Sequence, residues 1–212
     1  MRHLLLISAM ALAGSASVAR AGILYQFTID TSTIAGTAGS LDFNFNPGPL
    51  VTQAASLDIS SFLSDGTLVS GSCALGGPCL MGDVIGTLPG TLAFDNGTGF
   101  NDYFQDFTFG SALMFDVRLY GPAVNSPDGI STSGSTFAFS MFSDAAGTIP
   151  ILTSDLTDGF AATIGLNLDG TASVNNFSSD TAVSTPEPSS FALVGAVALG
   201  MLCRCRRWFS AQ

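Results

Sequence analysis

Apolar and polar side chains alternate along most of the chain between residues 22 and 180. Successive side chains of a strand point to opposite faces, so an alternation with a period of two is typical of a strand that is buried on one side. We therefore predict a strand wherever the alternation is regular. Six segments meet this condition: residues 23–29, 41–45, 103–109, 113–119, 137–141 and 160–168.

Shorter apolar stretches predict five more strands, at residues 56–62, 67–70, 83–88, 91–94 and 171–174. Turn-forming pairs separate the strands, and the last pair, Asp169-Gly170, predicts a two-residue hairpin turn. Between the two ends of the chain no long stretch has helical spacing. About ten short strands favour an all-β fold, an antiparallel β-sandwich of the jelly-roll kind, with an up-and-down barrel as the alternative.

The first 21 residues have the pattern of a secretory signal peptide, which would form an N-terminal signal helix. A short basic start precedes an apolar stretch at residues 4–13, and Ala19-Arg20-Ala21 has the small-x-small pattern of a cleavage site. We expect signal peptidase and the secretion machinery to act here, with cleavage between Ala21 and Gly22. The sandwich domain is then predicted over residues 22–180.

Three parts make up the segment that follows the sandwich. The first is a linker, the second is an apolar helix, and the third is a basic tail. They are residues 181–190 with the motif Pro186-Glu187-Pro188, residues 191–203, and residues 204–212 with Arg204, Arg206 and Arg207.

The apolar helix is predicted to be a short transmembrane helix. The uncharged run from residue 189 to residue 203 would extend ~22 Å as a helix, which is less than the ~30 Å hydrocarbon core of a bilayer. The arginines after it are expected to stay in the cytoplasm, which places the sandwich on the other side of the membrane. A span this short suits a temporary anchor better than a permanent one.

The Pro-Glu-Pro motif, the short apolar helix and the basic tail resemble, in this order, the PEP-CTERM sorting signal of exported bacterial proteins. The segments that begin at Gly22, Leu41 and Ser135 are similar to those of uncharacterised PEP-CTERM proteins, and such tails are also classified as the C-terminal domain of some ice-binding proteins. The resemblance implies that an exosortase recognises Pro186, Glu187 and Pro188 and that Arg204, Arg206 and Arg207 retain and orient the tail. It also implies transient anchoring, followed by release or transfer to the cell surface or extracellular space.

Aspartate dominates the charge between the two targeting segments. Residues 22–185 hold fifteen Asp and one Arg, a net charge of −14, with no Lys, Glu or His. Such a domain repels phosphate backbones, so we predict no nucleic-acid binding. Without His or Lys it cannot build a Ser-His-Asp triad, a Cys-His pair or a Schiff base. An Asp pair is the remaining catalytic option, at Asp102 with Asp106 or at Asp155 with Asp158, and we expect no enzyme.

Two cysteines, Cys73 and Cys79, close a loop rich in glycine and proline. In an exported protein such a pair is expected to form a disulfide. A zinc site is the weaker alternative, because two thiolates supply only half of the usual ligands and residues 22–185 contain no His.

The densest group of oxygen ligands lies at residues 95–102. Calcium binds about six to eight oxygens, which carboxylates, amides and backbone carbonyls supply. We therefore name Asp95, Asn96 and Asp102 as candidate calcium ligands. The alternative is a solvated turn held by hydrogen bonds from its Asp and Asn side chains. No other cofactor is expected.

Arg118 is the only cation within residues 22–185, and it shares a strand face with Asp116 and Tyr120. Three roles remain open for it: a pair with Asp116, an ion pair with a neighbouring strand, or a contact to an anion or sugar beside Tyr120.

These observations predict an exported, non-enzymatic protein of the cell surface or extracellular matrix. The alternative is a polysaccharide-binding β-sandwich module that depends on calcium, whose partner would be an exopolysaccharide. A domain without a groove carrying exposed aromatic side chains would favour the first interpretation.

Overall fold

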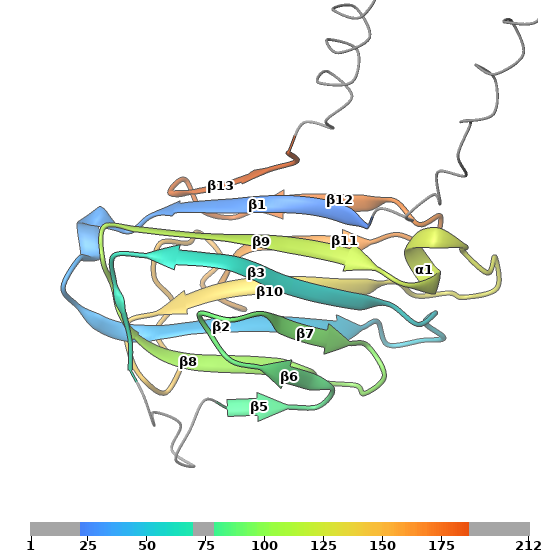
Figure 1. Cartoon of the computed structure of the whole chain (residues 1–212), viewed down its shortest axis with the longest axis horizontal. Helices are drawn as coiled ribbons and strands as arrows, with labels where there is room; N and C mark the ends of the chain where they lie inside the picture. The colour runs from blue at the N-terminus through green and yellow to red at the C-terminus, as the bar shows by residue number, and fades with distance from the viewer. Residues whose placement is uncertain (1–21, 70–78, 187–212) are drawn as a thin grey trace, which may run out of the picture.

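Two antiparallel sheets packed face to face make up residues 22–69 and 79–186, the part of the chain that the computed structural model describes (Figure 1). Neighbours in the first sheet, sheet A, are in order β13 (Thr181–Ser184), β1 (Ile23–Asp30), β9 (Ala112–Tyr120), β3 (Ser56–Ser64), β7 (Leu92–Asp95) and β6 (Val84–Gly86). Sheet B has the order β12 (Ala172–Asn176), β11 (Phe160–Leu166), β10 (Ser135–Phe142), β2 (Ala38–Pro47), β8 (Asp102–Thr108) and β4 (Thr67–Leu68), and β5 (Cys79–Met81) also pairs with β8.

Phenylalanine side chains from both sheets fill the space between them. The ring of Phe27 in β1 stacks on that of Phe115 in β9 at a centroid distance of 4.7 Å, and Phe115 meets Phe139 of sheet B at 5.0 Å. Phe43 in β2 lies 5.0 Å from Phe139 and 5.2 Å from Phe115. All four side chains are fully buried. The core is therefore a contiguous aromatic layer shared by the inner faces of the two sheets, as in other sandwiches.

The two antiparallel sheets agree with the predicted all-β fold. Each of the eleven predicted segments overlaps a strand, because alternation places every second side chain in the aromatic core. The chain also forms β5, β13, the 3₁₀ turn η1 (Ser32–Ile34) and the short helix α1 (Pro122–Asn125), none of which the alternation predicts. These elements are three or four residues long, too short to show a period.

The predicted two-residue turn at Asp169-Gly170 is wrong in length. β11 and β12 do pair as a hairpin, but β11 ends at Leu166 and β12 begins at Ala172. The Asn167 N–H donates to the Thr171 carbonyl at 2.8 Å, and the Asp169 carboxylate accepts the Thr171 N–H at 3.0 Å. The aspartate side chain therefore organises a longer loop in place of a tight turn.

Both targeting segments fall mostly outside the described residues. The predicted signal peptide at 1–21, the apolar helix at 191–203 and the basic tail at 204–212 are not among them. Within residues 22–69 and 79–186 no helix has the length and apolar character needed to cross a bilayer.

Candidate functional site

The predicted sorting motif follows the last strand of the sandwich almost directly. β13 ends at Ser184, and the exposed residues Thr185 and Pro186 come next, while Glu187 and Pro188 lie outside the described residues. β13 is the edge strand of sheet A and pairs antiparallel with β1, with Ser184 opposite Gln26 (Figure 1). The edge of sheet A therefore presents the start of the motif to solvent.

β13 belongs to the segment that the sequence assigns to the linker, yet it is held in the sheet. Ladder pairing with β1 covers Thr181 to Ser184. The Asn176 side-chain amide donates to the Thr181 carbonyl at 2.6 Å, and Val183 packs against the core. The folded sandwich thus reaches to Ser184 and leaves two residues before Glu187.

The other end of the sandwich domain lies at the same end of sheet A. Gly22 precedes β1, and the register of β1 with β13 brings the start of β1 and the end of β13 to the same side (Figure 1). A Cβ on Gly22 would lie 2.3 Å from the Leu119 carbonyl oxygen, so only glycine fits there without movement of β9. Ala21, the residue before the predicted cut, lies outside the described residues.

The predicted calcium ligands have different surroundings. Asp95 belongs to β7 in sheet A, where its carboxylate accepts a hydrogen bond from the Ser56 hydroxyl. The Asn96 side-chain oxygen accepts the Ala55 N–H at 2.9 Å, and its nitrogen donates to the Gln53 carbonyl at 2.9 Å and the Ser135 hydroxyl at 2.8 Å. Asp102 lies in β8 of sheet B. The structure does not gather these three side chains around one point.

Amide hydrogen bonds hold the 95–102 loop in shape. The Asn101 side chain is fully buried, and it donates to the Phe45 carbonyl at 2.9 Å and the Thr98 carbonyl at 3.0 Å. Its oxygen accepts the Asp83 N–H at 2.8 Å. The asparagines therefore use their oxygens within the fold, as expected for a turn that side chains stabilise. Across the described ranges no group of three or more His, Cys, Asp or Glu is placed to hold a metal.

Asp102 pairs with an aspartate other than the predicted Asp106. Its neighbour is Asp42 on the adjacent strand β2, in place of Asp106. Burial, followed by the contact with Asp102, raises the pKa of Asp42 well above its ordinary value, while the Asn44 amide donates to the Asp42 carboxylate at 2.7 Å. Burial also raises the pKa of Asp102. Only the register of β2 and β8 brings these residues together, so their sequence positions carry no signal of the pair.

The second predicted aspartate pair forms a turn. The Asp155 carboxylate accepts the backbone N–H groups of Thr157 and Asp158, each at 3.2 Å. The Asp155 side chain thus contacts the Asp158 backbone, and this arrangement is that of a capped turn.

Arg118 forms the ion pair across strands that was one of its three expected roles. Its guanidinium lies 3.9 Å from the carboxylate of Asp58, its register partner in β3, and 5.0 Å from the centre of the Tyr120 ring. The Tyr120 hydroxyl donates to Asp58 at 3.0 Å. Burial and this contact with Asp58 raise the pKa of Tyr120. The guanidinium therefore lies over one face of the Tyr120 ring.

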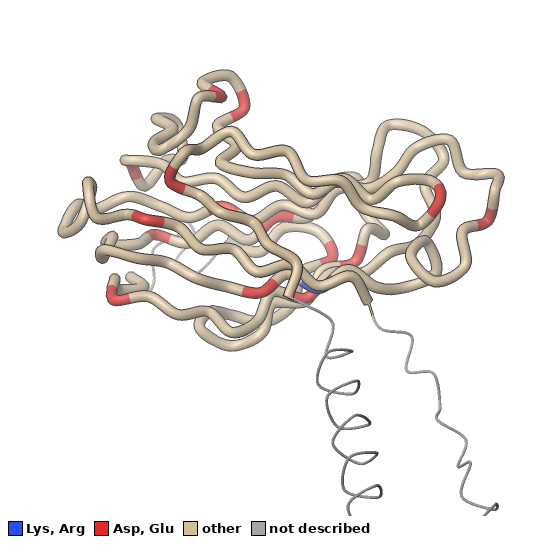
Figure 2. The backbone as a smooth tube through the Cα atoms, turned by 90° about the horizontal axis from the view of Figure 1, so that it is seen from above, with Lys and Arg blue, Asp and Glu red and all other residues tan. Residues whose placement is uncertain are grey.

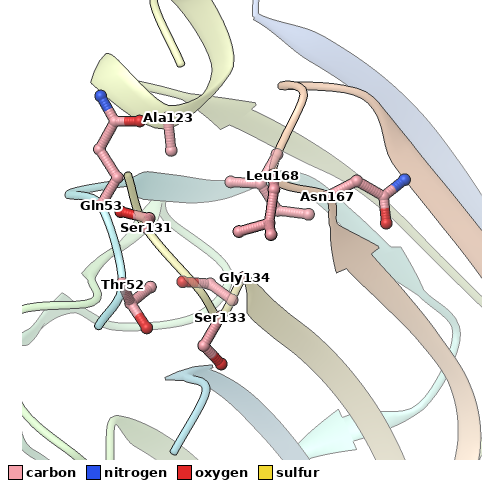
Figure 3. A pocket seen from close by; sticks show the side chains of 10 residues that line it. Thr52, Gln53, Ala123, Ser131, Ser133, Gly134, Asn167 and Leu168 are labelled. Carbon is pink, nitrogen blue, oxygen red and sulfur yellow. The ribbon is translucent and has the colours of Figure 1, made fainter. Parts of the chain in front are cut away.

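Two hollows are lined by hydroxyl and amide groups. The first lies where β10 begins and is lined in part by Thr52, Ser133 and Leu168 (Figure 3), and its volume of about 10 Å³ holds about one water molecule. The second, of about 670 Å³, lies beside the turn between β12 and β13. It is lined by Leu152, Thr153, Ser154, Asn176, Phe177, Ser178, Ser179 and Asp180.

The family model of the PEP-CTERM protein-sorting motif matches residues 184–207. The match begins at the last residue of β13 and includes Pro186, Glu187, Pro188 and the three arginines of the tail. It confirms the expected resemblance to PEP-CTERM proteins. Comparison with curated proteins and with solved structures found no match.

Proposed function

Because the chain carries a PEP-CTERM sorting motif, which indicates an exported and transiently anchored protein that an exosortase processes, we propose a non-enzymatic role at the cell surface or in the extracellular matrix. The observation that carries the proposal is the position of the motif, which starts where the folded sandwich ends. The delivered product is then an intact β-sandwich. The sorting tail is the part on which another protein acts.

The use of the aspartates supports a non-enzymatic role. Several of them cap loops with their carboxylates: Asp128 accepts the N–H groups of Ile130 and Ser131, and Asp144 accepts those of Thr148 and Ile149. Arg118, the single basic residue within residues 22–69 and 79–186, pairs with Asp58. These charged groups stabilise loops and sheets.

We further propose that the sandwich is a jelly roll with added edge strands. The chain crosses between the sheets at β1 to β2, β2 to β3, β3 to β4 and β5 to β6, and again at β7 to β8, β8 to β9, β9 to β10 and β12 to β13. This path gives the spatial orders β1-β9-β3-β7 and β2-β8-β4, in which early strands lie beside late ones. Two-sheet wrapping of this kind is typical of jelly rolls, and β10 to β13 extend the edges.

Replacement of the motif tests the sorting proposal. In cells that export the protein, the double variant Pro186→Ala/Pro188→Ala should still cross the membrane but should stay in the membrane fraction with its tail attached. Intact mass of the recovered protein measures the outcome, since a processed protein lacks the tail residues. The matched control is Pro49→Ala, which changes an exposed proline in the loop after β2. Equal processing of the double variant and the control would contradict the proposal.

Polysaccharide binding is the second candidate function, and the larger hollow is the observation that favours it. Its lining of residues with hydroxyl and amide groups, together with Phe177, suits a sugar, and it lies beside the turn that precedes β13, at the opposite end of that strand from the sorting motif. Much of the lining is already used within the fold: the Ser154 hydroxyl donates to the Phe177 carbonyl at 2.7 Å, and the Asn176 amide donates to Thr181. A glycan array distinguishes the two candidates, since binding that Phe177→Ala abolishes would support the module.

A further inference from the structure

Two carboxylates and one amide oxygen meet on the outer face of sheet B. Asn44 lies directly opposite Asp102 in the pairing of β2 with β8, and Asp42 is two residues from Asn44 on the same strand. The side chains of Asp42 and Asn44 share a face because alternate residues of a strand do. The Asn44 nitrogen donates to Asp42 at 2.7 Å, so the Asn44 oxygen is not used in that contact, and Asn44 is the register partner of Asp102.

Oxygen atoms of this group lack donors although they are buried. Asp102 is 8% exposed, and neither its Oδ1 atom nor the Oδ1 atom of Asn44 has a hydrogen-bond partner among the described residues. A buried acceptor without a donor is costly, and native structures usually satisfy such atoms with protein, water or an ion. The unpartnered oxygens therefore point to a missing positive group or donor.

No basic side chain supplies that positive group. Arg118 is the only Lys or Arg within residues 22–69 and 79–186, and it pairs with Asp58 on sheet A. The potential metal ligands at Asp42, Asn44 and Asp102 are all oxygen atoms, with no imidazole or thiolate among them. Hard divalent cations prefer such a set, and calcium accepts carboxylate, amide and water oxygens with flexible geometry.

We propose that Asp42, Asn44 and Asp102 bind a calcium ion on the outer face of sheet B. Asp42 and Asp102 supply carboxylate oxygens, the Asn44 Oδ1 atom supplies the amide oxygen, and water completes the shell. This site differs from the one expected at residues 95–102, because it takes only Asp102 from that set. Binding would join β2 to β8 through side chains, in addition to their backbone ladder.

Thermal unfolding of the full-length protein in detergent tests the proposal. The protein is first treated with a chelator, and calcium chloride alone is then added back before the Tm is measured again. Ligand that binds only the folded state stabilises it, and calcium at about 100 times its dissociation constant should raise the Tm by about 5–10 °C. Asp42→Asn and Asp102→Asn should each remove this rise. The matched control Asp116→Asn changes a carboxylate on sheet A and should keep it.

Calorimetric titration of the unchanged protein with calcium makes the test independent of the folding of the variants. One bound calcium per chain supports the proposal. Absence of heat together with an unchanged Tm overturns it, and the pair would then share a proton. A calcium-dependent rise that Asp42→Asn retains also overturns it, since the ion would bind elsewhere.

Discussion

At the scale of single residues, several aspartates accept hydrogen bonds from backbone N–H groups of loops and turns. Asp65 is the clearest case: its Oδ1 atom accepts the N–H of Ser111 at 2.8 Å and that of Ala112 at 3.0 Å, and its Oδ2 atom accepts the Ser111 hydroxyl at 2.7 Å. The Ser111 side chain, followed by these backbone N–H groups, lowers the pKa of Asp65 to about 2. One side chain thus ties the turn after β3 to the loop before β9.

This geometry predicts that Asp65 contributes to the stability of the fold and that acid removes this contribution. Its pKa in the folded state is below the ordinary 3.8, so its stabilising effect is complete above that value and is lost as the pH falls toward about 2. Asp65→Asn should therefore lower the Tm at neutral pH, and the difference from the unchanged protein should shrink between about pH 4 and about pH 2. Thermal unfolding at a series of pH values measures it. A difference that stays constant down to about pH 2 would contradict the assignment.

Residue identity alone predicted only part of the candidate site. The density of Asp and Asn at 95–102 suggested calcium ligands, but it did not reveal that Asn96 and Asn101 turn inward to hydrogen-bond the backbone. The contact of Asp42 with Asp102 depends on the register of two strands that are far apart in sequence. Register follows from the packing of the whole sheet, so a local pattern cannot supply it.

At the scale of elements, alternation predicted the strands well because one face of each long strand enters the aromatic core. β9 shows the pattern most fully: Leu113, Phe115, Val117 and Leu119 are buried between less buried neighbours. β13 escaped prediction because Val183 is its only large apolar residue, and its position depends on pairing with β1. Short edge strands therefore depend on tertiary contacts that no local pattern records.

The aromatic core predicts a large loss of stability when its central ring, that of Phe115, is removed. Phe115 contacts three other rings, those of Phe27, Phe43 and Phe139, at centroid distances of 4.7, 5.2 and 5.0 Å. Phe115→Ala would leave a cavity between the sheets and should lower the free energy of unfolding by about 3–5 kcal/mol. The control Phe100→Ala, at a ring that is 49% exposed, should cost about 1 kcal/mol or less. Denaturant unfolding compares them, and equal losses would refute the central role of Phe115.

At the scale of the whole molecule, the two ends of the sandwich domain lie close to each other, and its negative charge is spread widely. The start of β1 and the end of β13 lie at one end of sheet A (Figure 1), so the two predicted targeting segments join the sandwich there. The larger hollow lies beside the turn at the other end of β13. Aspartates are spread over many loops and strands, with a single basic position among the described residues (Figure 2). A delivered sandwich therefore presents an acidic surface on many sides.

This charge distribution predicts that salt stabilises the fold. A net charge of −14 over residues 22–185 opposes compaction, because folding brings the aspartates closer together. Raising sodium chloride from about 0.01 M to about 0.5 M shortens the screening length from about 30 Å to a few Å and weakens this repulsion, so the Tm should rise steadily. Chelator keeps calcium out of the measurement. Arg118→Ala removes the one positive charge of this region and should make the rise steeper, whereas a Tm that falls with added salt would mean that attraction between Arg118 and Asp58 outweighs the repulsion.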